Sequence, residues 1–300
     1  MSTTKRTTLL ASASMSNKPV NQDSLALVRN ERAGLSAAIV ADGIGSHYGA
    51  ETAAAIAVEA LRNQLDQIVA SSALDFKNMF QCAADELTAY VKSQATALPP
   101  GLHEGNSFGT TLLCVAETDA HIVAAYVGNG AILRIRGNFL SFPPALPLPW
   151  CIQNLLSPHS ISENGRAALY KWISPWAPSA ASVPDQICFA KNQDPYGEIV
   201  LACSDGLYSA DQTVVGKDDS NRVWISAEPA LLLLVAHLRH LFTLPALDDA
   251  TLQSALEDYL AELQANGMVD DDCSVAALIT EQALRYQASH KAHSNLGGLP

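Results

Sequence analysis

The sequence predicts an α+β fold in which groups of strands alternate with groups of helices. Three observations indicate this fold. Short apolar runs bounded by Gly, Asn and Asp are typical of strands. Longer segments repeat apolar residues every three or four positions, as amphipathic helices do. Apolar residues make up 48% of the 300-residue chain, which is enough for a sizeable core.

In the first half of the chain, the apolar pattern predicts a hairpin, two helices and a meander. A polar loop between two apolar runs indicates the hairpin, and short turns between three later runs indicate an antiparallel meander. The N-terminal residues predict a first strand, since their apolar stretch is too short and too rich in Ser and Thr for a signal peptide. The expected elements are hairpin strands Ser24–Arg29 and Leu35–Val40, helices near Gly49–Ala70 and Leu74–Lys92, and meander strands Thr111–Glu117, His121–Val127 and Ala131–Arg136.

Residues 138–197 differ in composition from the rest of the chain. They hold nine of the 15 prolines and three of the four tryptophans, so they are expected to form an inserted flap or an irregular surface layer. The tryptophans are expected mainly to pack this layer, with a peptide-binding face as the alternative. The expected later elements are strand Glu198–Cys203, helices Pro229–Phe242 and Asp248–Ala265, and strand Cys273–Ile279. We expect one domain over residues 1–280 and a polar, flexible tail over 281–300.

Composition excludes several classes of protein. The formal charge is −12 and no basic stripe is present, which argues against nucleic-acid binding. No apolar run reaches the ~18 residues needed to span a bilayer, so no membrane association is expected. The six cysteines have no metal-ligand spacing, and three lie in apolar runs. That pattern is typical of reduced, buried thiols and indicates a cytoplasmic location.

Four acidic residues stand at the ends of predicted strands. Asp42 and Asp205 each follow an apolar strand and precede Gly, whereas Asp23 and Asp271 precede strands. In an antiparallel pair the start of one strand lies beside the end of the other. The hairpin therefore brings Asp23 next to Asp42, and Asp271 falls near Asp205 if the last strand pairs with Glu198–Cys203.

Such a group of carboxylates points to metal chemistry. Neighbouring carboxylates repel one another at neutral pH unless they take up protons or bind cations. All-oxygen ligands favour Mg²⁺ or Mn²⁺, and the Gly43 carbonyl is a further candidate ligand. Two such ions about 3.5–4 Å apart can share a hydroxide and hold a phosphate for in-line attack. An Asp-Gly pair after a strand is most often only a turn, so the prediction depends on all four acids together.

Six segments occur in an order that resembles one enzyme family. They are NKPVNQDS, VADGIGSHYGAE, SFGTTL, YVGNGAIL, LACSDGLYS and DDCSVAAL, between about Lys18 and Ile279. This set resembles the metal-dependent protein serine/threonine phosphatases of the phosphatase-2C (PPM) type, bacterial branch. The resemblance implies a four-layer α-β-β-α sandwich of two antiparallel sheets flanked by helices. We therefore expect residues 1–280 to be a single phosphatase domain, with residues 138–197, which the resemblance covers poorly, as a flap or insertion.

The resemblance assigns roles by position. Asp42 would bridge two Mg²⁺ or Mn²⁺ ions, the Gly43 carbonyl would bind one, and Asp205 and Asp271 would bind the other. Asp23 would hold metal-bound water or act as a direct ligand. A metal-bridging hydroxide would then hydrolyse phosphoserine and phosphothreonine on proteins without a phosphoenzyme. The implied partners are phosphorylated proteins and an opposing serine/threonine kinase.

Four positions depart from the family pattern. Lys18 stands where the family has a phosphate-binding arginine, and lysine lacks the bidentate fork of arginine. Asn129 replaces an acid associated with a third metal, so that site is expected to be impaired. Ile44 stands where animal members have a general-acid histidine, and His47 is expected to be a solvated loop residue rather than its substitute. Gln22 replaces a common glutamate, a change that bacterial members often share.

Other acids near the motifs are expected to have lesser roles. Asp270 and Asp272 are interpreted as turn or supporting groups beside Asp271, and Asp211 as a solvated loop residue. Two alternative functions stay open. One is a catalytically weak or inactive pseudophosphatase that binds phosphoproteins, motivated by Lys18 and Asn129. The other is an N-terminal-nucleophile hydrolase, which shares the layered sandwich but would need a processed Ser, Thr or Cys at its start.

Overall fold

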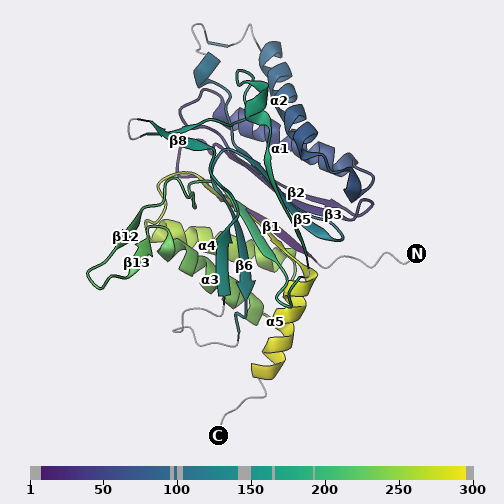
Figure 1. Ribbon diagram of the computed structural model, residues 1–300, viewed down its shortest axis with the longest axis vertical. Coiled ribbons are helices and arrows are strands. Elements are labelled where there is room, and N and C mark those ends of the chain that lie inside the picture. The colour runs from purple at the N-terminus through teal and green to yellow at the C-terminus, as the bar shows by residue number, and fades with distance from the viewer. Residues whose placement is uncertain are drawn as a thin grey trace.

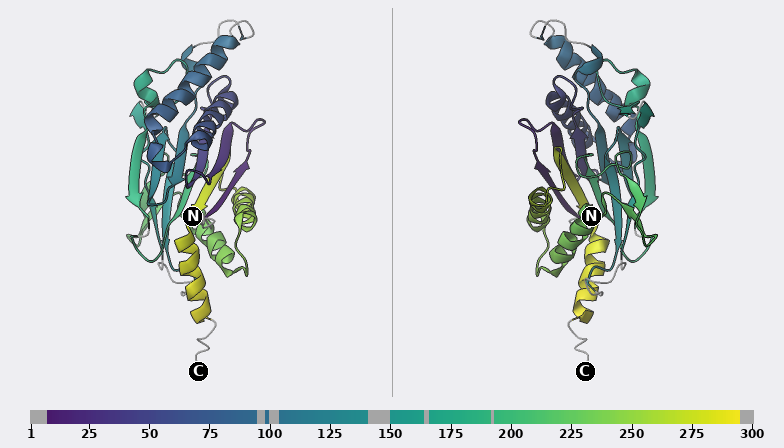
Figure 2. Two further views of the ribbon diagram at one scale, coloured as in Figure 1. Left: turned by 90° about the vertical axis from the view of Figure 1, so that its right-hand side faces the viewer. Right: turned by 90° about the vertical axis from the view of Figure 1, so that its left-hand side faces the viewer.

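Two antiparallel five-stranded sheets lie against each other, and helices cover their outer faces (Figure 1, Figure 2). The computed structural model describes residues 8–94, 98–99, 104–140, 150–163, 166–191 and 193–294. The predicted α+β class and the four-layer sandwich are confirmed.

Each sheet combines strands from both halves of the chain. One sheet has the order β10-β5-β4-β3-β2 and the other the order β1-β14-β11-β6-β7. The strands of the first sheet are β2 (Asp23–Asn30), β3 (Leu35–Asp42), β4 (Leu112–Glu117), β5 (His121–Val127) and β10 (Asp185–Ala190). The strands of the second are β1 (Leu9–Met15), β6 (Ala131–Gly137), β7 (Trp150–Asn154), β11 (Ile199–Cys203) and β14 (Cys273–Ile279). The strands β8 (Ser160–Glu163) and β9 (Arg166–Leu169), and β12 (Val215–Lys217) and β13 (Val223–Ile225), form two small separate hairpins.

Strand β3 shows how the layers are built. Successive side chains of a strand point to opposite faces, and both faces of this central strand are buried. Ala37 and Ile39 pack in the core beneath α1 (Ala50–Gln67) and α2 (Phe76–Ser93). Ala38 and Val40 pack in the core between the two sheets. The apolar run in the sequence therefore reflects burial on both sides.

The remaining helices cover the second sheet and extend beyond it. Helices α3 (Glu228–Thr243) and α4 (Asp249–Ala265) form the third core with that sheet. The Asp248 carboxylate begins α4 with a capping box to Thr251. None of the helices in the described part of the chain is long and apolar enough to cross a bilayer.

The predicted three-stranded meander is only partly right. Strands β4 and β5 pair as expected, but β6 leaves for the other sheet and pairs with β11 and β7. The crossing occurs at Gly128 and Gly130, whose φ angles are 104° and 94°. Side chains with a Cβ rarely adopt such angles, so the Gly-Asn-Gly turn permits a change of sheet as readily as a hairpin.

Residues 138–197 are more regular than expected, although 141–149, 164–165 and 192 lie outside the described residues. The segment supplies edge strand β7 to one sheet and edge strand β10 to the other, and it forms the β8–β9 hairpin between them. Trp176 is 40% exposed and donates from Nε1 to the Ser107 hydroxyl over 3.0 Å.

The expectation of a flexible tail after residue 280 is wrong for the part that is described. Residues Glu281–Ser294 form helix α5, which projects from the body (Figure 1). Although α5 is mostly polar, two of its residues, Ala283 and Gln287, are buried against the body. Ala283 packs against Gly197, and the Gln287 side chain donates to the Gly137 carbonyl and accepts from the Phe139 amide. Those two bonds continue the hydrogen bonding of β6 beyond its end.

Candidate functional site

The four predicted acids are positioned in two pairs by strand register. In the first sheet, Asp23 at the start of β2 lies directly opposite Asp42 at the end of β3. The pairing continues one residue further, because the Gly43 amide donates to the Gln22 carbonyl over 3.0 Å. A Cβ on Gly43 would lie 2.5 Å from the Ala50 carbonyl oxygen, so this approach requires glycine. The hairpin argument from the sequence therefore places this pair correctly.

The second pair comes from the other sheet. Strands β11 and β14 are antiparallel, with Cys203 opposite Val275. Beyond Cys203 the chain continues to Asp205 at the edge where β14 begins, next to Asp271. Gly206 is packed so closely that a Cβ would lie 2.0 Å from the Asp272 carbonyl oxygen. The glycine after Asp205 is therefore needed for this turn to approach the β14 entry.

Ser204 connects the two pairs, although no motif in the sequence singles it out. Its hydroxyl donates to Asp23 Oδ2 over 2.8 Å and accepts from the Ser274 amide over 2.9 Å. Asp23 belongs to one sheet, whereas Ser204 and Ser274 belong to the other. One hydroxyl thus ties the two sheets together beneath the acids. The only local signal is its place before an acid at a strand end.

The acids open onto a pocket of about 190 Å³. Asp42, Asp205 and Asp271 all contribute to its walls, whereas Asp23 is not among the lining residues. The lining residues are Lys18, Asp42, Ile44, Gly45, Thr111, Asn129, Ser160, Leu169, Asp205, Asp211, Gln212 and Asp271. They come from both sheets, from the β8–β9 hairpin and from the loop that follows β11.

Burial and mutual repulsion disfavour charge on the inner pair. Burial is the larger cause that raises the pKa of Asp42 well above its usual range, and the charges of Asp205, Asp23 and Asp271 raise it further. Burial also raises the pKa of Asp23 to about 6, despite hydrogen bonds from Ser274 and Ser204 that lower it. A positive charge brought to this position would relieve both effects.

The donors around the pocket fit hard divalent cations in their chemistry. They are carboxylate and carbonyl oxygens, the ligand type that Mg²⁺ and Mn²⁺ prefer. Asp23 Oδ1 is buried and has no hydrogen-bond partner among the described groups, so it is free to accept from a bound water or to face a cation. Within the described residues, no three His, Cys, Asp or Glu side chains lie close enough together to hold a metal ion as they stand. The carboxylates therefore share a pocket without forming a complete coordination cage.

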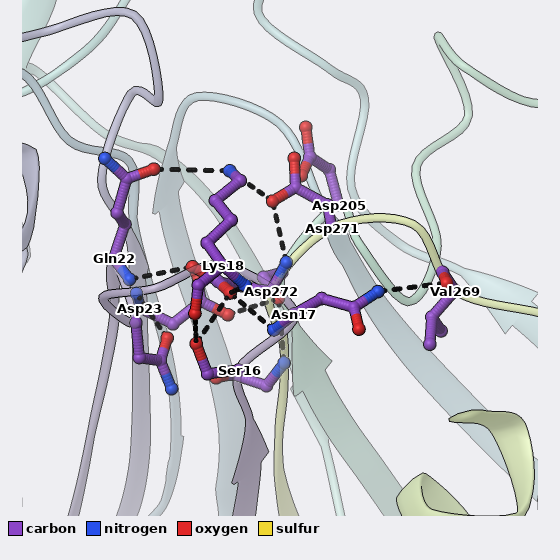
Figure 3. Close-up of polar contacts among 12 residues, drawn as sticks. Ser16, Asn17, Lys18, Gln22, Asp23, Asp205, Val269, Asp271 and Asp272 are labelled. Atoms are coloured by element: carbon purple, nitrogen blue, oxygen red, sulfur yellow. Dashed lines mark hydrogen bonds and ion pairs between the residues drawn. The ribbon is translucent and has the colours of Figure 1, made fainter. Parts of the chain in front are cut away.

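Lys18 supplies a positive charge inside this acidic group (Figure 3). Its ammonium forms an ion pair with Asp271 and donates to Gln22 Oε1 over 3.2 Å. Burial lowers the pKa of Lys18, but the contact with Asp271 and the charges of Asp272 and Asp42 outweigh burial and raise it. Lys18 thus lines the pocket as expected, while its charge is engaged by one of the predicted metal ligands.

Asp272 has a supporting role that its neighbour Asp271 does not share. Its carboxylate is buried and accepts from the backbone amides of Asn17, Lys18 and Gln22 over 2.8, 3.1 and 2.9 Å (Figure 3). Burial raises the pKa of Asp272, but these amide hydrogen bonds outweigh burial and lower it. Asp272 therefore holds the loop that carries Lys18, while Asp271 opens onto the pocket. Asp270 is exposed.

Two amides and a further acid surround Asp205. Asn129 Nδ2 and Gln212 Nε2 donate to Asp205 Oδ2 over 2.9 and 2.6 Å. An aspartate at position 129 would repel this carboxylate, whereas asparagine stabilises it. The expectation that Asp211 is solvated is wrong. Asp211 lines the pocket, accepts from Ser209 Oγ, and has a buried Oδ2 without a partner among the described groups.

The backbone of Asp42 is held by Thr110 and Thr111, which directly precede β4. Thr111 accepts from the Asp42 amide at its Oγ1 over 2.9 Å and donates from its own amide to the Asp42 carbonyl over 2.8 Å. The Thr110 hydroxyl donates to the same carbonyl over 2.9 Å. These contacts fix the end of β3 against the start of β4.

His47 does not line the pocket, and its ring is not freely solvated as expected. It packs against Gly109, where a Cβ would lie 2.3 Å from the ring Nδ1. Nδ1 is buried without a partner among the described groups, and burial lowers the pKa of His47. Ile44 and Gly45 form this part of the pocket wall instead.

Comparisons with known proteins agree with this arrangement. A sequence model described as protein phosphatase 2C matches residues 12–142. No curated protein sequence matches the chain.

Solved structures share the whole fold. The Streptococcus agalactiae serine/threonine phosphatase is similar with a TM-score of 0.58 and 17% identity, covering 91% of this chain and 100% of that chain. Stp1 from Staphylococcus aureus is similar with a TM-score of 0.59 and 17% identity, covering 93% and 96%. PstP in complex with two manganese ions is similar with a TM-score of 0.54 and 17% identity, covering 91% and 97%. Residues 12–142 thus match the sequence model of protein phosphatase 2C, and the described residues share the fold of these solved phosphatases.

Proposed function

We propose that the chain is a Mg²⁺- or Mn²⁺-dependent phosphatase that hydrolyses phosphoserine and phosphothreonine on proteins, and so opposes a serine/threonine kinase. One observation carries the proposal: strand register brings Asp23 opposite Asp42, and Asp42, Asp205 and Asp271 open onto one pocket. The manganese complex of PstP, which has the same fold, supports the choice of metal.

The proposed cation ligands are Asp42, the Gly43 carbonyl, Asp205 and Asp271, with Asp23 as a ligand or as the acceptor of a water proton. Bound cations would supply an activated water as the nucleophile and neutralise the charge of the phosphate. With water as the nucleophile, no phosphoenzyme forms. None of the lining residues is a cysteine or a histidine, which accords with that route.

The other lining residues have roles in binding and in shaping the pocket. The Lys18 ammonium would attract the phosphate as a point charge. Ile44 and Leu169 form apolar parts of the wall. Because Asn129 donates to Asp205, a third cation has one acidic ligand fewer, and we propose that this third site is impaired.

Three features bear on where the protein acts and on what. All six cysteines are free, and three are buried, which supports a reducing, cytoplasmic location. The acidic charge of −12 disfavours nucleic acid as the substrate. We expect no membrane partner.

One observation favours a second candidate function, a pseudophosphatase that binds phosphoproteins with little or no turnover. The Lys18–Asp271 ion pair already neutralises one predicted ligand, so cation binding has to displace the ammonium. Manganese titration by calorimetry and phosphopeptide turnover separate the two functions. Metal binding with turnover supports the phosphatase, whereas metal binding without turnover of any phosphopeptide supports the alternative.

The proposal is tested with purified protein and p-nitrophenyl phosphate. We expect hydrolysis with Mn²⁺ and its loss in EDTA. Asp42→Asn should abolish turnover while its circular dichroism spectrum stays native. Asp258→Asn, which removes an exposed charge on α4, is the matched control and should keep wild-type activity. Near-normal activity of Asp42→Asn would refute the assignment.

A further inference from the structure

The β12–β13 hairpin exposes an unusual amount of apolar surface. Among the described residues, six large hydrophobic side chains are more than half exposed, and three of them belong to this hairpin and its stem. They are Val214 at 60%, Val215 at 65% and Val223 at 56%. The two strands pair only with each other, and the hairpin projects from the body (Figure 1). Exposed apolar surface of this kind is typical of binding sites.

The stem of the hairpin is part of the pocket wall. Asp211 and Gln212 line the pocket and come directly before Thr213 and Val214. The stem is closed by two hydrogen bonds, from the Ser226 amide to the Val214 carbonyl over 2.9 Å and from the Val214 amide to Ser226 Oγ over 3.0 Å. Because extended chain spans about 3.5 Å per residue, Val214 lies within about 7 Å of the pocket wall.

A second hairpin forms the opposite part of the wall. Ser160 and Leu169, at the base of β8–β9, line the same pocket, and Ile161 beside them is 53% exposed. This base is anchored beside the Asn129 turn, since His159 donates from its amide to the Gly128 carbonyl and accepts from the Gly128 amide at its Nδ1. Both hairpins project on the same side of the molecule in Figure 1. The pocket therefore lies between two hairpins that each carry exposed aliphatic side chains.

The charges near the β12–β13 hairpin disfavour an acidic partner. Asp218 and Asp219 occupy its turn, and the Asp218 carboxylate accepts from the Ser220 and Arg222 amides, each over 2.9 Å. The positive groups of the hairpin are Lys217 and Arg222, and Arg222 is paired with Glu228. With Asp211 in the stem and a chain charge of −12, acidic side chains on a partner would be repelled.

We propose that Val214, Val215 and Val223, with Ile161 on the facing hairpin, bind aliphatic residues that flank the phosphorylated residue of the substrate. This inference rests on the proposed function and names its substrate class: an extended phosphoprotein segment with aliphatic and basic, rather than acidic, neighbours. A phosphorylated residue in the pocket brings the residues two to four positions away within about 7 to 14 Å of it, which is the reach of the hairpin stem.

The test compares a small substrate with peptides. The hairpin variant carries Val215→Ser and Val223→Ser, and the matched control carries Val69→Ser, a 59% exposed valine that lies outside both hairpins and the pocket wall. Each protein is assayed on p-nitrophenyl phosphate and on peptides that contain one phosphothreonine. In these peptides the residues before or after the phosphothreonine are valines and lysines, serines and lysines, or valines and glutamates.

The wild type should prefer the valine-lysine flank on at least one side. The hairpin variant should lose about tenfold in kcat/KM on that peptide, since two partly buried aliphatic contacts are removed, and keep its activity on p-nitrophenyl phosphate. Equal losses on both substrates, or no loss on the peptide, would overturn the inference. If the wild type hydrolyses neither substrate, the proposed function fails. Peptide binding by fluorescence anisotropy then tests the hairpin surface separately.

Discussion

The raised pKa of Asp23 predicts that the acidic site destabilises the metal-free protein at neutral pH. Asp23→Asn removes the charge while keeping an oxygen that can accept from Ser204. Burial raises the pKa of Asp23 from 3.8 to about 6. Each pKa unit corresponds to about 1.36 kcal/mol, so the charged carboxylate costs the folded state about 3 kcal/mol at pH 7.

The sign follows from proton binding. Between about pH 4 and pH 6 the folded protein holds a proton on Asp23 that the unfolded chain has lost, so stability falls as the pH rises through this window. Asp23→Asn lacks this dependence. The free energy of unfolding of the variant, minus that of the wild type, should be near zero at about pH 4 and reach about 3 kcal/mol above pH 6.

The assay is urea unfolding of EDTA-treated protein at pH steps from about 4 to 8. Acids that do not contact Asp23 titrate alike in both proteins and cancel in the difference. Asp42 does not cancel, because the loss of the Asp23 charge removes one cause of its raised pKa and so further favours the variant at neutral pH. Asp258→Asn controls for the loss of one negative charge. Mn²⁺ should then stabilise the wild type more than Asp23→Asn. A variant that is less stable than the wild type at neutral pH, or a difference that does not change with pH, would contradict the reasoning.

Two further predictions concern the groups that hold the site. Lys18→Gln removes the ammonium that pairs with Asp271, so the dissociation constant for Mn²⁺ in calorimetry should fall about fivefold; an unchanged or larger constant would show that the ion pair does not compete with the metal. Ser204→Ala removes the hydroxyl that joins Asp23 to the Ser274 amide and should lower the free energy of unfolding by about 1–3 kcal/mol, whereas stability equal to the wild type would show that the bridge contributes little.

The parts of the site that the sequence predicted depend on local pattern. An apolar run followed by Asp-Gly marks a strand end, and an antiparallel neighbour places a second acid beside it. This reasoning located Asp23 opposite Asp42 without any knowledge of the fold. For Asp205 and Asp271 the reasoning depended on a condition, the pairing of the last strand with Glu198–Cys203, which the structure shows.

The parts that the sequence did not predict depend on contacts between distant segments. Ser204 matters because Asp23, 181 residues away, lies across the sheet interface, and Asp272 matters because it accepts from a loop about 250 residues earlier. A serine in an apolar strand and the third acid of a run have no pattern that reveals such partners. The crossing at Gly128–Gly130 has a clear local signal, but that signal is ambiguous. The same turn residues fit a hairpin and a change of sheet, so the sequence predicted the hairpin.

These distant contacts explain how the chain keeps four acids together. Three of the acids are held by polar neighbours other than Lys18: Asp42 by Thr110 and Thr111, Asp23 by Ser204, and Asp205 by Asn129 and Gln212. The carboxylates therefore stay at one pocket even though their charges repel one another. Because the strands already hold them there, cation binding does not require the strands to rearrange. Binding of a cation to Asp271 would require the Lys18 side chain to move away from it. The variants Asp23→Asn and Lys18→Gln separate two effects on cation binding. Asp23→Asn reduces the repulsion among the carboxylates, and Lys18→Gln removes the positive charge that pairs with Asp271.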